Sequence, residues 1–171
     1  MDRSKVPAVL SIAGSDSSGG AGIQADIKTI TAHRLYAETA ITAITAQNTL
    51  GVTAVQNISP DIVAAQIDAV FDDIRPNAVK IGMVSSAEII DVIADRLSAW
   101  NATNVVVDPV MVATSGARLI AEDAAEALTR RLFPLATVIT PNIPEAMALL
   151  DYEVDSERTQ QNAAMLLTRR F

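Results

Sequence analysis

The chain has 171 residues and a formal net charge of −7 at pH 7. This acidic balance argues against a nucleic-acid-binding groove, which needs a basic patch. The absence of cysteine excludes disulfides and thiolate chemistry. Gly14 interrupts the first apolar run too early for a signal peptide, and no apolar stretch approaches the length of a membrane span. We therefore expect a cytoplasmic protein that interacts with neither membranes nor nucleic acids.

Apolar runs and helical periodicities alternate along the chain. We predict strands near residues 8–12, 39–45, 52–58, 78–82, 104–108 and 136–140. Helical patterns lie near residues 21–33, 60–71, 86–99, 121–131, 143–150 and 157–169. Such alternation indicates βαβ units, and we expect a single α/β domain over residues 1–171 with a mostly parallel sheet and helices on both faces.

The segment 39–58 departs from this alternation. Two β-like runs flank residues 47–51, Gln-Asn-Thr-Leu-Gly, and leave no room for a crossover helix. We therefore expect these two runs either to pair in antiparallel fashion or to project from the sheet as a flap.

A glycine-rich stretch, residues 14–22, follows the first predicted strand and precedes the first helical pattern. Glycine lets a ligand approach the backbone closely, and the free N–H groups at a helix start favour anions or carbonyl-type acceptors. Ser17 or Ser18 is expected to cap the helix that follows. On spacing alone, this stretch is equally consistent with a ligand-binding loop and with a tight turn that binds nothing.

Polar residues gather where the predicted strands end, which is the edge at which open parallel sheets bind ligands. Asp108 directly follows three valines, where a carboxylate is costly to bury unless a partner or a cation lies close. Asn142 and Glu145 have the spacing of a helix capping box. Taken alone, Asp26 fits a solvated acid in an early helix turn, and Lys80 fits a salt-bridged strand residue.

Five motifs give the chain a family resemblance: AGSDSSGGAGIQAD, ITAITAQNTLGV, VKIGMV, VVVDPVMVATSG and VITPNIPEA. They are similar to motifs of the hydroxymethylpyrimidine/phosphomethylpyrimidine kinases of thiamine biosynthesis, which belong to the ribokinase-like superfamily. The resemblance extends from about Val9 to Leu150 and is weaker beyond. It implies a ribokinase-like fold that phosphorylates 4-amino-5-hydroxymethyl-2-methylpyrimidine and its monophosphate, with ATP and Mg²⁺ as cofactors.

The resemblance also assigns roles to residues of this chain. Asp26 matches an aspartate that contacts the aminopyrimidine and its hydroxymethyl group, and the amide of Gln47 suits an aminopyrimidine edge. Glu145 and Asp108 are expected to act on Mg²⁺ through its bound waters. The residues implied in substrate binding are Gly14, Asp26, Gln47, Met83 and Val110, and those on the Mg-ATP side are Asp108, Asn142 and Glu145.

The family has a second glycine-rich loop, which supplies the anion hole and the catalytic residue. Here Gly116 is the last glycine, so this loop has no counterpart. Residues 113–117, Ala-Thr-Ser-Gly-Ala, also depart from the Lys-Ser-Gly-Asp of relatives and lose a cation and an acid, which puts any phosphate-ordering role of this loop in question. We therefore expect the N-terminal portion of such a kinase, without a catalytic residue of its own. The resemblance also implies that the full-length form is a homodimer. Two alternatives stay open: a pyridoxine- or pyridoxal-type kinase, and a non-catalytic pyrimidine-binding fragment.

Overall fold

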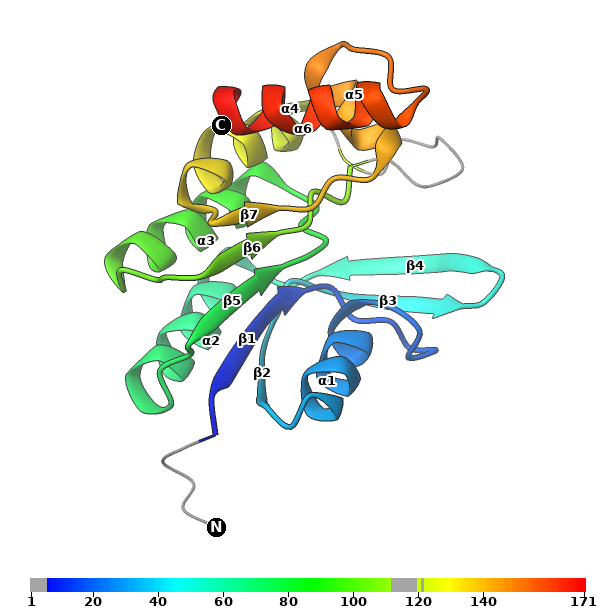
Figure 1. The fold of residues 1–171 in the computed structure, drawn as a ribbon. Helices are drawn as coiled ribbons and strands as arrows, with labels where there is room; N and C mark the ends of the chain where they lie inside the picture. The colour runs from blue at the N-terminus through cyan, green and yellow to red at the C-terminus, as the bar shows by residue number, and fades with distance from the viewer. Residues whose placement is uncertain (1–5, 112–119, 121) are drawn as a thin grey trace.

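The computed structural model describes residues 6–111, 120 and 122–171. A five-stranded sheet with the order β2-β1-β5-β6-β7 forms its centre, and each neighbouring pair of strands runs parallel (Figure 1). The predicted parallel sheet is therefore confirmed. Its strands are β1 (Ala8–Ala13), β2 (Tyr36–Ile41), β5 (Ala78–Ile81), β6 (Val105–Val107) and β7 (Val138–Ile139).

Helices cover both faces of this sheet. α2 (Pro60–Asp73) and α3 (Ala87–Ala99) pack together on one face, and α1 (Gly22–Ala32) lies on the other beside β1 and β2 (Figure 1). This placement follows from right-handed crossovers. The connection from β1 to β2 runs toward one edge of the sheet and the connection from β5 to β6 runs toward the other, so the two crossover helices lie on opposite faces. The chain then forms α4 (Glu122–Ala127), α5 (Ile143–Leu150) and α6 (Glu157–Arg170). In the described part of the chain, no helix is both long and apolar enough to cross a membrane.

The helix expected over residues 121–131 is shorter than predicted. α4 ends at Ala127, and the chain continues as a π-helical turn, Leu128–Leu132, and a 3₁₀ turn, Phe133–Leu135. Pro134 lacks a backbone N–H, so α-helical hydrogen bonding cannot continue through this position.

A two-stranded antiparallel hairpin, β3 (Ala43–Asn48) and β4 (Gly51–Asn57), stands apart from the parallel sheet (Figure 1). The antiparallel pairing is confirmed, but the prediction of one strand over 39–45 is wrong, since β2 and β3 divide it at Thr42. The Thr42 N–H donates to Ala13 O (3.0 Å) and its hydroxyl donates to Met83 O (3.1 Å). These tertiary bonds hold the residue at which the chain leaves the sheet.

The core lies between the sheet and the helices α2, α3 and α4. Most of its side chains are branched aliphatics, including fully buried Ile12, Ile67, Ile81 and Ile93. Among the buried carboxyls, the one on β2 has an unpaired oxygen. Glu38 in β2 is 8% exposed, and its Oε2 atom has no hydrogen-bond partner.

Candidate active site

Asp16 organises the glycine-rich loop between β1 and α1. Its Oδ1 accepts hydrogen bonds from the Ser18 N–H and hydroxyl, and its Oδ2 accepts from the N–H groups of Gly20 and Ala21, all at 2.8–2.9 Å. The Ser18 hydroxyl and these three backbone groups lower the pKa of Asp16, although its burial opposes them. The loop is therefore held in one conformation from inside by a carboxylate.

The predicted cap of α1 by Ser17 or Ser18 is wrong. The residue at the cap position is Ala21, which has no side-chain cap, and its N–H is taken by Asp16. The two serine hydroxyls bond elsewhere, to Asp16 and to Gln47. The signal in the sequence was an Asp followed by small residues, which typically accepts backbone N–H groups of the turn that it starts.

The carboxyl ends of β1 and β5 form the point where the strand order reverses, because β1 connects to β2 on one side and lies beside β5 on the other. In open parallel sheets, ligands bind in the crevice at such a point. Gly14 follows β1, Met83 follows β5, and a Cβ atom at Gly14 would lie 2.7 Å from Met83 Cε. Two of the residues expected to bind substrate thus meet at this crevice.

Asp26 reaches this crevice from α1. Its Oδ2 accepts a hydrogen bond from Ser11 Oγ (2.6 Å) and forms an ion pair with Lys80 Nζ (3.0 Å). Ser11 in β1 and Lys80 in β5 are partners in the strand register, so the carboxylate spans the two strands. Asp26 is therefore not the solvated acid that its pattern alone favours, whereas the salt-bridged interpretation of Lys80 is confirmed.

Gln47 lies at the end of β3, against the glycine-rich loop. Ser17 Oγ donates to Gln47 O (2.6 Å) and accepts from Gln47 N–H (2.8 Å). The side-chain Oε1 of Gln47 lies 3.3 Å from Thr45 Oγ1, whose proton is donated to Ser15 O. The hairpin thus brings this predicted substrate residue to the same loop that Gly14 begins.

Asn142 and Glu145 form the predicted capping box at the start of α5. Asn142 Oδ1 accepts from Glu145 N–H (2.9 Å), and Glu145 Oε2 accepts from Asn142 N–H (2.8 Å). The other carboxylate oxygen of Glu145 accepts from Met111 N–H (3.1 Å), and the residue is 2% exposed. Glu145 therefore also fixes the chain that follows β6.

Asp108 interacts electrostatically both with the Asp26–Lys80 pair and with Glu145 of the capping box. Burial raises its pKa, Lys80 lowers it, and the negative charges of Glu145 and Asp26 raise it. The Val110 N–H donates to Asp108 O at 2.9 Å, which places Val110 after β6, the strand next to β5. The sheet therefore gathers the predicted residues along one edge, from Asp26 to Glu145.

Among residues 6–111, 120 and 122–171, no group of three or more His, Cys, Asp or Glu side chains converges as a ready-made metal site. Asp108 and Glu145 are two carboxylates near one another in this edge, and Mg²⁺ needs only one or two carboxylates beside phosphate oxygens and waters. Asp108 is half-buried, whereas Glu145 is buried with both carboxylate oxygens bonded to backbone N–H groups, so Asp108 is the more accessible of the two to a hydrated Mg²⁺. Residues 113–117, whose phosphate-ordering role the sequence put in question, lie outside the described residues.

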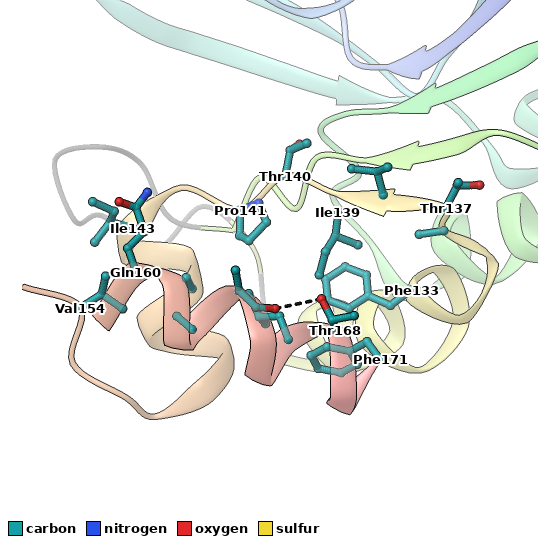
Figure 2. A pocket seen from close by; sticks show the side chains of 16 residues that line it. Phe133, Thr137, Ile139, Thr140, Pro141, Ile143, Val154, Gln160, Thr168 and Phe171 are labelled. Carbon is teal, nitrogen blue, oxygen red and sulfur yellow. Dashed lines mark hydrogen bonds between the residues drawn. The ribbon is translucent and has the colours of Figure 1, made fainter. Parts of the chain in front are cut away.

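A separate groove of about 570 Å³ runs along β7 and α6 (Figure 2). Phe133, Ile139 and Phe171 give it an apolar wall, and the rings of Phe133 and Phe171 meet edge to face with centroids 4.8 Å apart. None of the predicted site residues lines it. The residues predicted from the sequence therefore lie along the strand ends, from the β1–β5 crevice to the start of α5, and not in this groove.

Solved structures define the class of this fold and site. Phosphomethylpyrimidine kinase from Clostridium difficile 630 matches with a TM-score of 0.92 and 49% identity, covering 96% of this chain and 71% of that one. Pyridoxal kinase from Bacillus subtilis, in an ADP complex, matches with a TM-score of 0.86 and 38% identity over 96% of this chain and 63% of its own. The chain has the α/β fold of the ribokinase-like vitamin kinases.

Sequence comparisons then give the family. A family model described as phosphomethylpyrimidine kinase matches residues 16–171. The hydroxymethylpyrimidine/phosphomethylpyrimidine kinases of Rhizobium meliloti (54% identical, 93% of this chain) and Escherichia coli K12 (48% identical, 92% of this chain) match as well. The chain belongs to the phosphomethylpyrimidine kinase family, and it spans 60% of the length of these two relatives.

Proposed function

We propose that this chain carries the pyrimidine site of a hydroxymethylpyrimidine/phosphomethylpyrimidine kinase. The reaction transfers the γ-phosphoryl group of ATP to the hydroxymethyl oxygen of 4-amino-5-hydroxymethyl-2-methylpyrimidine, and then phosphorylates the monophosphate. The observations that support this proposal are the contact between Gly14 and Met83 at the carboxyl ends of β1 and β5, the ion pair of Asp26 with Lys80 of β5, and the bond of Gln47 to the glycine-rich loop.

Each of these residues offers the chemistry that an aminopyrimidine needs. Asp26 presents an acceptor for an amino or hydroxyl proton, and its Oδ2 is held by Ser11 and Lys80. The amide of Gln47 both donates and accepts, as does the edge of an aminopyrimidine. Met83 supplies an adaptable apolar surface, and its Cε packs against Gly14 in the space that a Cβ would occupy. Binding is thus oriented by fixed polar groups in a small crevice.

Phosphoryl transfer depends on positioning and on stabilising the charge of the moving group. Asp108 and Glu145 would hold Mg²⁺ through its waters, and the ion would supply positive charge to the phosphate oxygens. The backbone bonds of Glu145 to residues 111 and 142 fix its carboxylate before any ligand arrives. The Asn142 side chain caps α5 by accepting from the Glu145 N–H, which keeps Glu145 in the first turn of this helix.

Calorimetric titration with the aminopyrimidine tests the proposal. Gln47→Ala should weaken binding by about 1–3 kcal/mol, because a polar edge of the ligand loses its partner. Asp26→Asn should weaken binding or turnover while the protein stays folded. Unchanged pyrimidine affinity in both variants would contradict the substrate assignment.

A second candidate is pyridoxal phosphorylation, favoured by the likeness to the Bacillus subtilis pyridoxal kinase structure. Titration with pyridoxal beside the aminopyrimidine separates the two functions. We expect the aminopyrimidine to bind more tightly, since the Gln47-Asn48-Thr49 sequence of the hairpin resembles the pyrimidine kinases more than the pyridoxal kinases.

We also propose that the protein works as a homodimer that uses the hairpin. Every residue of β4 is exposed, including Val52 and Val55, although a two-stranded hairpin alone is marginally stable in water. Burial against a second copy would stabilise this surface.

A further inference from the structure

The glycine-rich loop runs beside β3 and bonds three alternate residues of it. The Ser15 N–H donates to Ala43 O (2.8 Å), and Thr45 Oγ1 donates to Ser15 O (2.7 Å). Ser17 then forms the third connection, to the backbone of Gln47. The loop thus borders the hairpin as a neighbouring strand would.

The Ser17 connection differs from the others because one hydroxyl satisfies both backbone groups of Gln47. It donates to the carbonyl oxygen at 2.6 Å and accepts from the N–H at 2.8 Å. The hairpin register is irregular at this very place, where Ala46 pairs with Ala54 but Gln47 pairs with Val52. A bulge disrupts the ladder locally and weakens its hold on the strand. The orientation of Gln47 therefore depends on a side chain from outside the hairpin.

We propose that Ser17 is a positioning residue for substrate recognition: its hydroxyl fixes the backbone of Gln47, and with it the place of the Gln47 amide beside the glycine-rich loop. Ser17 itself need not touch the ligand. This inference rests on the proposed function, because it assumes that the amide of Gln47 binds the pyrimidine.

A double-mutant cycle on pyrimidine binding tests this role. We expect Ser17→Ala to raise the Kd for the aminopyrimidine about tenfold, because an amide that must first be ordered binds less tightly. In a Gln47→Ala background the same substitution should change the Kd less than twofold, since no amide remains to be positioned. Ser17→Thr, which keeps the hydroxyl, should restore most of the affinity.

Ser18→Ala is the matched control. Ser18 belongs to the same loop, but its hydroxyl donates to Asp16 and does not contact the hairpin. We expect its Kd to stay within twofold of the wild type. A loss as large as that of Ser17→Ala would show that general loosening of the loop, and not the bond to Gln47, controls the affinity, and would overturn the proposal.

Amide hydrogen exchange gives a readout that needs no ligand. The Gln47 N–H donates to Ser17 Oγ, so its exchange should be faster in Ser17→Ala and unchanged in Ser18→Ala. Equal protection of Gln47 in Ser17→Ala and the wild type would overturn the positioning role.

The outcomes separate the two proposals. If Gln47→Ala weakens binding but Ser17→Ala does not, or if the two effects simply add, the positioning role is wrong and the proposed function stands. If the wild type binds no pyrimidine, or Gln47→Ala binds it unchanged, the proposed function fails and the positioning role fails with it.

Discussion

Lys80 Nζ lies 3.0 Å from Asp26 Oδ2, and this ion pair joins β5 to α1 across the β1–β5 crevice. Both side chains are largely shielded, with 28% and 20% of their surfaces exposed, so the pair is less screened than an ordinary surface pair. Lys80 also lowers the pKa of Asp108. A single cation therefore acts on both Asp26 and Asp108, the acids that we propose for the pyrimidine side and the Mg-ATP side.

Replacement of this cation should impair both binding and stability. We expect Lys80→Met to weaken aminopyrimidine binding at least tenfold and to lower the thermal midpoint, because Asp26 keeps its burial but loses a charged partner. Lys80→Arg should retain part of the affinity. Arg130→Met is a suitable control, since Arg130 and its partner Glu126 are mostly exposed. Calorimetry and thermal melts on these three variants decide the matter, and wild-type affinity in Lys80→Met would contradict the role of the ion pair.

Gly14→Ala should block the crevice while leaving the fold intact. The new Cβ would lie 2.7 Å from Met83 Cε, the far end of a flexible side chain that can move aside. The displaced methionine would then occupy space that the pyrimidine ring needs. We expect Kd for the aminopyrimidine to rise at least tenfold with a small change in thermal midpoint. A large loss of stability would instead indicate that Gly14 serves the fold.

Stability should fall as pH rises through the titration of Glu38. Burial, and secondarily the charge of Asp73, raise the pKa of Glu38 from 4.5 to about 7. Between these values the folded state keeps a proton that the unfolded state releases, so the free energy of unfolding decreases with pH, by roughly 3 kcal/mol in total. The full contribution is present below pH 4.5 and is lost above about pH 7.

Glu38→Gln tests this assignment because it keeps the shape of the side chain and removes the titration. We expect the variant to melt at a higher temperature than the wild type at pH 8 and to show a shallower dependence on pH. If the two proteins lose stability in parallel from pH 5 to pH 8, another group is responsible.

The outer edge of the sheet should make the 171-residue polypeptide prone to self-association. Within the described residues β7 pairs only with β6, and Val138 on it is 49% exposed and lines the groove along α6. Open strand edges template further pairing, and a lysine on the edge blunts it. We expect light scattering to detect species larger than a dimer, and Val138→Lys to reduce them. If Val55→Lys in the hairpin removes these species and Val138→Lys does not, this prediction is wrong.

Phosphoryl transfer by the 171-residue polypeptide should be slow even where pyrimidine binding survives. The moving phosphoryl group requires preorganised N–H donors or cations, and no glycine follows Gly116 to build a second loop of such donors. Loss of one such element typically lowers the rate about 10²–10³-fold. ADP formation with the aminopyrimidine and Mg-ATP, followed beside the Escherichia coli kinase, checks this. Turnover comparable to that enzyme would show that the donors come from elsewhere, for example from a second subunit.

Local patterns predicted the parts of the structure that local interactions determine. The spacing of Asn142 and Glu145 predicted the capping box because both partners lie within four residues. The alternation of strands and helices predicted the parallel sheet because parallel strands need crossover helices between them, although the pairing itself joins distant residues. The boundary at Thr42 was missed, since the bonds that create it reach residues 13 and 83. The partners of Ser17 and Asp26 were missed for the same reason.

The different sequence separations within the site imply an order in which it assembles. Asp16 bonds to residues two, four and five positions away, so the glycine-rich loop can take its conformation as soon as the local chain collapses. The Asp26–Lys80 pair closes a separation of 54 residues and exists only once β5 has docked beside β1. Closing long loops before their contacts form is slow and entropically unfavourable. A ligand that needs Asp26 held by Lys80 therefore binds only the docked state, and by mass action it protects the sheet against partial unfolding at β5.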